Sequence, residues 1–474
     1  MIGPHRLPCE TPRAQAPSGR ISGATRWVLP ATILGSSLSF IDSSVVNVAL
    51  PAIQRDLGAD FATAQWLVNG YMLALASLIL LGGSAGDRFG RRRVFLGGLV
   101  LFGVASLACA VAPSAAWLVA ARVIQGVAAA FLTPASLAII GAAYEGEARG
   151  PAIGTWAAAG ALTTALGPPL GGWLVDTVGW RSIFLINLPV ATAALLLGSR
   201  LTADRGTRRA GPVDASGAAL AITALGALSF GLIALGEGNR ATGTVALAIA
   251  LPLGWVFTMA ERRSRAPMMP LDLFKNRAFS GANLLTVLLY ASLSAALFLL
   301  PFTLIRVHGF SATAAGAAFV PFSVIMGAGS RWSGRLAARY GARLSLIVGP
   351  LFTAFGFVIL GASAGASSYL TGTLPGLLVV AVGMTITVAP LTTAVFDAVP
   401  EGASGTASGI NNAAARTGGL VAVAALGLAF GGQSADMEPA ELIAAYRLVL
   451  FVAAGLAGSS AMTAALTIGS NRGR

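Results

Sequence analysis

The sequence predicts an all-α membrane protein in which fourteen transmembrane helices form two six-helix bundles plus two additional central helices. The first observation is composition: 55% of the 474 residues are hydrophobic and only 10% are charged, whereas a soluble chain carries about 25% charged residues. The second is that the apolar residues gather in long runs. At roughly 1.5 Å of rise per residue, these runs match a hydrocarbon core of about 30 Å. They lack the alternation of membrane-spanning strands, which leaves helices.

Fourteen apolar runs follow one another along the chain. Residues 1–27, before the first run, are rich in Pro and Arg, and we expect them to form a disordered cytoplasmic tail. The first run starts too far from residue 1 and is too long for a cleaved signal segment, so we expect it to be the first helix. The runs are 28–49, 65–86, 94–112, 116–142, 151–175, 182–199, 216–236, 243–260, 279–304, 312–331, 344–363, 371–395, 408–431 and 444–469.

The runs divide the chain into three membrane regions. Six runs lie in 28–199 and six in 279–474, so each of these regions is expected to fold as one bundle. The two additional helices lie between them, in 200–278, and basic loops flank them on both sides.

The two predicted bundles repeat short stretches of sequence at a nearly constant offset. The stretch GSAGDRFGRR at 83–92 resembles GRLAARYGAR at 334–343, and a Leu-Pro pair followed by ATA occurs before both. Such short matches also arise by chance in Ala- and Gly-rich sequence, but their common order favours a duplication. Related bundles that rock about a central site are typical of transporters.

Charge is distributed unevenly across the predicted membrane. With the N-terminus inside, 24 of the 31 Lys and Arg residues lie in cytoplasmic segments, five lie outside, and two, Arg122 and Arg416, lie within spans. The acidic residues show no such bias. This pattern is the positive-inside rule, and it predicts that both termini are cytoplasmic. The net charge of +13 therefore indicates a membrane topology and no nucleic-acid partner.

Asp42 is the single acidic residue within the predicted spans. A carboxylate at the centre of a span costs on the order of 3 kcal/mol, so a function is expected there. It borders a polar stripe of Ser36, Ser39, Ser43 and Asn47, and such a stripe faces the protein interior or a water-filled cavity. We expect Asp42 to take up a proton outside and to release it inside. The alternative is a structural Asp that Ser39 or a neighbouring helix satisfies.

Four motifs resemble those of a known family. They are IDSSVVNVALP at 41–51, GSAGDRFGRRR at 83–93, RVIQG at 122–126 and GALTTALGPPLGG at 160–172. With the helix count, they make the chain similar to the fourteen-helix drug:proton antiporters of the major facilitator superfamily. Ala85, Gly86 and Ser44 stand where Leu, Ala and Thr are usual, and these exchanges are small or apolar.

The resemblance implies the major facilitator fold and proton-coupled export by alternating access. It assigns proton coupling to Asp42 and to Arg122, which is expected to face the same cavity. The alternative for Arg122 is that its head snorkels to the outer surface.

The resemblance also implies two structural motifs. A cytoplasmic gate motif between the second and third helices comprises Gly83, Asp87, Arg88, Gly90, Arg91 and Arg92, with Asp87 and Arg88 expected just past the second helix. An antiporter motif in the fifth helix comprises Gly160, Gly167, Pro168, Gly171 and Gly172. The alternatives are plain anchoring of the arginines to headgroups and ordinary helix packing of the glycines.

Other energy sources and activities find no support in the sequence. A Walker loop needs a Lys after a Gly-rich segment, and the single Lys, Lys275, has no such segment before it. Both histidines, His5 and His308, lie in the tail or a loop, and no His, Cys or acidic cluster has metal-ligand spacing. We therefore expect no enzyme activity, no metal and no cofactor, with the proton gradient as the energy source.

The expected function is export of lipophilic drugs, antibiotics or a toxic metabolite across a bacterial cytoplasmic membrane by a monomer. The alternative is proton-linked uptake or exchange of a small polar nutrient or a siderophore-like compound. Because the spans hold one acid, a monocationic or neutral substrate is expected. Arg416 is expected only to anchor the inner end of its span. Candidate substrate contacts, each of which could instead be ordinary packing, are Ser39, Asn47, Gln125, Trp156 and Tyr290.

Overall fold

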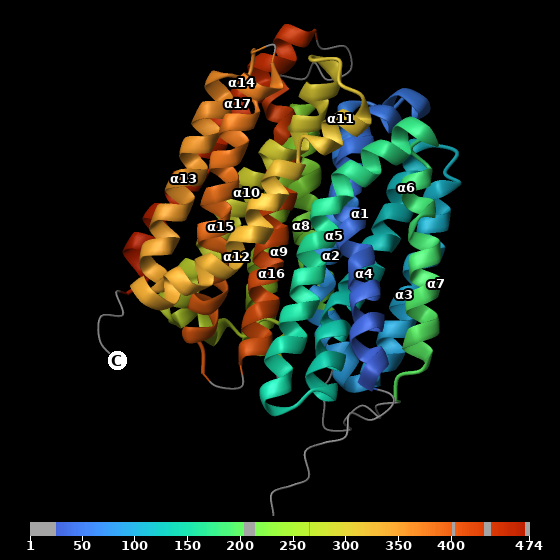
Figure 1. Cartoon of the computed structure of the whole chain (residues 1–474), viewed down its shortest axis with the longest axis vertical. Helices are drawn as coiled ribbons and strands as arrows, with labels where there is room; N and C mark the ends of the chain where they lie inside the picture. Colours follow the sequence, from blue (N-terminus) through green and yellow to red (C-terminus); the bar gives the residue numbers. More distant parts are fainter. Residues whose placement is uncertain are drawn as a thin grey trace, which may run out of the picture.

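The computed structural model describes residues 25–202, 214–264, 266–366, 368–400, 403–430 and 438–469. Within these residues the chain is helical and contains no strand (Figure 1), which confirms the predicted class. Of the expected tail, residues 1–24 lie outside the described part, and Thr25–Trp27 form a 3₁₀ turn that leads into the first helix.

The helices follow the predicted runs closely. In the first half they are α1 (Val28–Leu57), α2 (Phe61–Phe89), α3 (Arg91–Ala110), α4 (Ala115–Ala143), α5 (Arg149–Thr177), α6 (Ser182–Leu185) and α7 (Asn187–Ser199). The central pair is α8 (Ala215–Gly236) and α9 (Arg240–Arg263). In the second half they are α10 (Arg277–Arg306), α11 (Ala312–Ala317), α12 (Val320–Tyr340), α13 (Ala342–Ala362), α14 (Tyr369–Gly372), α15 (Leu374–Asp397), α16 (Ser404–Ala425) and α17 (Pro439–Thr467).

Three predicted runs are interrupted helices. Each break, between α6 and α7, between α11 and α12, and between α14 and α15, comes shortly before a proline. The prolines are Pro189, Pro321 and Pro375, and each lacks the N–H that would bond to the carbonyl four residues earlier. The prolines therefore explain why these spans are built from a short and a longer piece.

Among the described residues, thirteen segments are long and apolar enough to cross a membrane. The predicted fourteenth span is α5, a continuous helix of 29 residues. Its Gly, Thr and Pro content lowers its hydropathy, but its buried glycines and Pro168 pack against α1 and α11. Polar and small residues are tolerated there because they contact protein instead of lipid.

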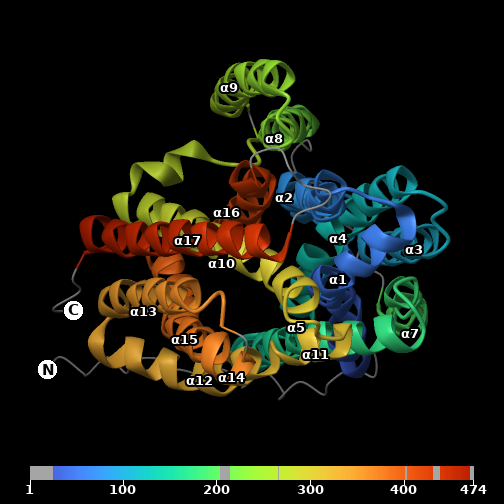
Figure 2. The ribbon, with the colours of Figure 1, turned by 90° about the horizontal axis from the view of Figure 1, so that it is seen from above.

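The helices form two groups with the central pair at the periphery. Seen from above, α1 to α7 lie on one side and α10 to α17 on the other, while α8 and α9 stand outside them next to α2 and α16 (Figure 2). Close packing of α8 on the C-terminal group is made by Gly236, which lies against the backbone of Gly427. On the other group, the Phe230 ring of α8 lies 6.4 Å from the ring of Trp66 in α2.

Two acids stabilise the end of the α8–α9 hairpin where α8 begins and α9 ends. Asp214 caps α8, because its Oδ1 accepts the Gly217 N–H at 2.8 Å and the Ser216 hydroxyl at 2.9 Å. Glu261, near the end of α9, is 2% exposed, and its Oε2 accepts the Met269 N–H at 2.9 Å. Burial raises the pKa of Asp214, but hydrogen bonds from Gly217 and Ser216 outweigh it, so this pKa lies below its ordinary value.

The two groups are joined at the end of the molecule that carries the α1–α2 and α10–α11 turns. The sequence predicts that this end faces outside, and we call it the outer end. Arg306 on α10 donates to Gln54 on α1 at 3.0 Å. Asp176 on α5 accepts the N–H groups of Ala312 and Thr313 at the start of α11, at 3.2 and 2.7 Å. These contacts close the outer end.

The predicted duplication has a counterpart in two turns. Gly90, between α2 and α3, has φ +95°, and Gly341, between α12 and α13, has φ +82°. Residues with a side chain rarely adopt such angles. The two positions are 251 residues apart, the offset of the repeated stretch, so the halves share this turn as well as its sequence.

Candidate functional site

The single acid of the predicted spans lies in a polar cluster between α1, α3, α4 and α7. Asp42 is fully buried, and its Oδ2 forms an ion pair with Arg122 of α4. Its Oδ1 accepts the amide of Gln125 at 2.9 Å and the amide of Asn187 at 3.3 Å. Ser106 on α3 completes the cluster, because its hydroxyl contacts both amides at 2.9 Å. The charge is therefore satisfied by two neighbouring helices, α4 and α7, and not by Ser39.

Arg122 is held as firmly as the carboxylate it faces. Its Nε donates to the Leu67 carbonyl at 3.2 Å, and its Nη1 donates to Gln125 Oε1 at 2.7 Å. Its guanidinium lies 4.3 Å from the centre of the Tyr71 ring and 5.9 Å from that of Phe184, where cation–π attraction is expected. With 2% of its surface exposed, Arg122 does not reach the outer surface, so the snorkelling alternative is wrong.

The sequence pointed to part of this cluster only. Asp42 and Arg122 stand out in the sequence as charges within apolar spans, and Gln125 as a candidate substrate contact. Asn187 was missed, although it stands alone in the apolar run 182–199 and the same argument would have found it. Ser106 carried no signal, because single serines are common in membrane helices.

The glycines of the antiporter motif pack α5 along α1 on both sides of Asp42. A methyl group added at Gly160 would overlap the ring of Phe40, and one added at Gly167 would overlap the Ser44 side chain. The expected close helix approach is therefore present. Gly171, one turn beyond Gly167, lies in the same way against Val45.

The same motif also contacts the other half of the molecule. Gly172 lies against the backbone of Ala312 in α11, and Gly316 of α11 lies against the carbonyl of Pro168. Pro168 and its neighbour Pro169 lie inside α5 and remove two backbone donors from it. Helix α5 thus connects the helix that carries Asp42 with the closed outer end.

The second helix continues further into the cytoplasmic gate motif than expected. Asp87 and Arg88 belong to the last turn of α2, which continues to Phe89, and Gly83 lies two turns before its end. The reason is that the helix ends only where Gly90 takes its positive φ. Hydropathy places Asp87 and Arg88 just past the helix, because it marks the edge of the lipid and not the end of the helix.

The described contacts of the gate motif lie within the first half. Arg91 pairs with Asp87 at 3.1 Å and donates to the Ala138 carbonyl of α4 at 3.3 Å. Arg92 donates to the carbonyls of Gly198 and Ser199 at the end of α7, at 3.3 and 2.6 Å. These contacts tie the α2–α3 turn to α4 and α7.

The five candidate substrate contacts lie in different surroundings. Gln125 is fully buried in the Asp42 cluster, so in this conformation it is closed to a substrate. Trp156 donates from its Nε1 to the Ser36 hydroxyl at 3.0 Å, and Ser39 bonds to its own helix. Asn47 and Tyr290 are half-buried, on α1 and α10, and the Asn47 Oδ1 is buried without a partner among the described residues.

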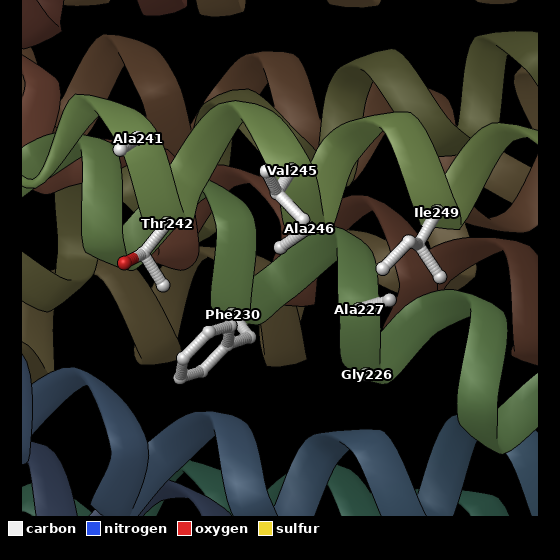
Figure 3. Close-up of a pocket in the computed structure, with 8 residues that line it drawn as sticks. All are labelled: Gly226, Ala227, Phe230, Ala241, Thr242, Val245, Ala246 and Ile249. Carbon is white, nitrogen blue, oxygen red and sulfur yellow. The ribbon is translucent and has the colours of Figure 1, made fainter.

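A groove of about 600 Å³ lies away from this cluster, on the α8–α9 pair (Figure 3). Its lining is almost wholly apolar, and it is widely open. Phe230 and Thr242 stand at one end of it and Ile249 at the other. Its lining comes from α8 and α9 alone, and no residue of the Asp42 cluster contributes to it.

Comparison with known proteins gives a consistent result. The family model described as Major Facilitator Superfamily matches residues 32–423. The Tetracenomycin C resistance and export protein of Streptomyces glaucescens is 35% identical over 90% of this chain and 80% of its own length. The Multidrug resistance protein Stp of Mycobacterium tuberculosis is 36% identical over 87% and 77%. The Cephamycin export protein CmcT of Amycolatopsis lactamdurans is 34% identical over 92% and 91%.

Solved structures support the fold. A D-xylose-proton symporter superposes with a TM-score of 0.67 at 15% identity, covering 95% of this chain and all of its own. A bacterial homologue of the human lysosomal transporter Spinster gives a TM-score of 0.65 at 19% identity, covering 94% and 98%.

Proposed function

Because the chain belongs to the Major Facilitator Superfamily, we propose that it exports a small lipophilic drug, antibiotic or toxic metabolite in exchange for protons, by alternating access. The observation that carries the proposal is the buried Asp42–Arg122 pair, placed on the helix against which α5 packs. Relatives of similar length are named as resistance or export proteins, which favours export over the uptake of a polar nutrient.

Protonation of Asp42 would act on the packing of α1. It removes the negative charge and leaves Arg122 buried without its counter-ion. Breaking a buried pair in this way costs about 3–5 kcal/mol. Reversing a two-state equilibrium from 1:99 to 99:1 takes about 5.5 kcal/mol, so one proton supplies a large part of the free energy that a conformational switch needs.

Helix α5 is the element that transmits the change. It contacts α1 through Gly167 and Gly171, and it contacts α11 of the other half through Gly172. A shift of α1 after protonation would move α5 and thereby open the outer end. The structure, with a paired Asp42 and a closed outer end, corresponds in this scheme to the state that has released its proton and faces the cytoplasm.

The remaining features of the proposal follow from this scheme. The proton gradient is the energy source, and no cofactor or metal takes part. The protein acts as a monomer in a bacterial cytoplasmic membrane, with both termini in the cytoplasm, as the positive-inside rule requires. A neutral lipophilic substrate fits the scheme. A cationic one, which the sequence also allowed, would have to displace Arg122 from a fully buried Asp42.

The proposal is tested by uphill export after reconstitution into liposomes with an imposed pH gradient, using fluorescent drugs and dyes that the wild type exports from cells. Asp42→Asn should fold and insert but lose uphill export. The control is Asp397→Asn, which neutralises an exposed carboxylate at the end of α15 and should export normally. Uphill export at the wild-type rate by Asp42→Asn would refute proton coupling through this residue.

A further inference from the structure

Arg416 is the second arginine in the middle of a span, and its surroundings differ from those of Arg122. It lies 12 residues after the start of α16, so it does not anchor the inner end of that helix as the sequence suggested. Its side chain is half-buried. Unlike Arg122, it makes no hydrogen bond or ion pair with any residue in the described part of the chain.

The contacts of α16 place Arg416 between the two halves. Gln65 of α2 donates to the Ala424 carbonyl at 3.1 Å, and Leu80 of α2 meets Gly409. The two residue numbers of each pair sum to 489, as they do when two antiparallel helices pack side by side at a constant register. By the same relation, Arg416 lies level with Leu73, midway along α2.

The other flank of α16 is fixed by α10. Asn411 donates to the Thr286 hydroxyl at 2.7 Å, and Gly418 packs on the backbone of Val287. Asn412, one turn from Arg416, is exposed although α2 and α10 flank its helix. Because α8 covers the peripheral side of α16 (Figure 2), the open face that carries Asn412 and Arg416 is turned toward the interior between the halves.

The groups around Arg416 can donate hydrogen bonds but carry no negative charge. Tyr290 of α10 is half-buried, and its hydroxyl has no partner among the described residues. Asn411 contacts Thr286 and Gly419 contacts Ser294, each at an offset of 125 positions, so Arg416 lies level with Ala291, the neighbour of Tyr290 in α10. Asp42, the one acid in the middle of the spans, is already neutralised by Arg122. The described membrane interior is thus left with one uncompensated cation.

We propose that Arg416, with Tyr290 beside it, binds an acidic group of the exported compound, so that the substrates are lipophilic organic anions. The inference rests on the proposed export function. A guanidinium binds a carboxylate through two parallel hydrogen bonds, which no cationic or purely apolar compound reproduces. The phenol hydroxyl of Tyr290 donates a third. A cationic drug of the same shape is repelled, because the only carboxylate at this depth is occupied.

An anionic substrate also fits the driving forces across a bacterial membrane. When an anion leaves and a proton enters, two charges move in the direction that the inside-negative potential favours. Exchange of a cation for a proton moves no net charge. The net charge moved across the membrane in each transport cycle therefore distinguishes anionic from cationic substrates, in addition to their binding affinities.

The test uses three probes with one lipophilic body: pyrenebutyrate, its neutral methyl ester and the cationic pyrenebutylamine. Their binding to the purified full-length protein is measured by quenching of tryptophan fluorescence. The wild type should bind the acid at least about tenfold more tightly than the amine. Arg416→Gln should abolish this preference, and Arg416→Lys should keep part of it. Arg240→Gln, which removes an exposed arginine at the start of α9, should bind like the wild type.

The outcomes separate this inference from the proposed function. Equal affinity of the wild type for acid and amine, no binding of the acid, or an unchanged preference in Arg416→Gln would overturn it. Binding needs no gradient, so Asp42→Asn should retain the preference for the acid even though it loses uphill export. A failure of proton coupling alone would leave that preference in place.

Discussion

Arg122 and Asp42 lie 80 positions apart in the sequence and form an ion pair of which 2% and 0% of the side-chain surface is exposed. The pair joins α1 to α4 in the middle of the first half. Because both charges are cut off from water, their interaction is hardly screened, and a change in one partner acts fully on the other. Proton binding and helix packing are therefore linked at this point.

Removing the cation of this pair should destabilise the protein. Arg122→Gln leaves a buried carboxylate without its partner, and we expect a loss of about 3–5 kcal/mol in the free energy of unfolding. The double variant Asp42→Asn with Arg122→Gln should recover much of this loss, because no charge remains buried. Thermal unfolding in detergent compares the variants.

An exposed pair serves as the control. Arg181 and Asp56, at the outer end, are 44% and 47% exposed at a distance of 2.7 Å. Arg181→Gln should cost less than about 1 kcal/mol, since solvent screens such pairs. If the Asp42→Asn, Arg122→Gln double variant were as unstable as Arg122→Gln alone, the electrostatic account of the buried pair would be contradicted.

The packing of α5 on α1 can be tested with two glycines of the same helix. Gly167→Ala places a methyl group onto the Ser44 side chain and should abolish transport, while Gly154→Ala meets nothing within 4 Å and should be harmless or slightly stabilising. Transport is measured in cells at matched expression. Adding Ser44→Ala to Gly167→Ala removes the overlapping oxygen and should restore part of the activity; no restoration would mean that the close contact is not what the alanine disturbs.

The turn between α2 and α3 makes a separate demand on the backbone. Gly90 has φ +95° with ψ 124°, a conformation that costs an L-residue about 1–3 kcal/mol. Gly90→Ala should therefore lower the thermal stability by that amount. Gly97→Ala, in α3 with open space around it, is the matched control and should not. Equal stability of the two variants would show that the turn relaxes without strain.

Asp214 should make the α8–α9 pair sensitive to acid. Its pKa is below its ordinary value, because hydrogen bonds from Gly217 and Ser216 outweigh its burial. The folded state therefore gains stability from the ionised carboxylate above its ordinary pKa, and this gain is lost as the pH falls through the lower, folded-state pKa. Asp214→Asn can still cap α8, so this variant should lose only the pH-dependent contribution of Asp214 to the stability of the folded state.

The measurement for this prediction is the unfolding temperature of the purified protein between pH 7 and pH 3. The wild type should lose more stability over this range than Asp214→Asn. Asp272→Asn, which removes an exposed carboxylate paired with Lys275 in the loop after α9, is the comparison and should change the slope less. Parallel curves for wild type and Asp214→Asn would contradict the assignment.

Hydropathy and the cost of charge in lipid predicted most of the fold and the centre of the site. These two criteria did not predict where the helices end or which polar side chains pair with one another, and the reasons are physical. Helix α1 continues from the predicted 49 to Leu57, because a helix ends where its backbone turns, here at Gly58 with φ +59°, and not where the lipid ends. Asp42 and Arg122 could be named because charges need partners. The partner itself is set by how α1, α4 and α7 pack, which the sequence of one helix does not contain.

The position of the α8–α9 pair makes the transporter asymmetric toward the lipid. Helix α8 contacts α2 of one half and α16 of the other, so it bridges the seam between the halves on that flank. A lipophilic compound that enters sideways from the inner leaflet would meet a covered seam there. On the opposite flank α5 contacts α11 and α12 directly, and no further helix in the described part of the chain lies over that seam (Figure 2). We therefore expect lateral entry to be easier on that flank.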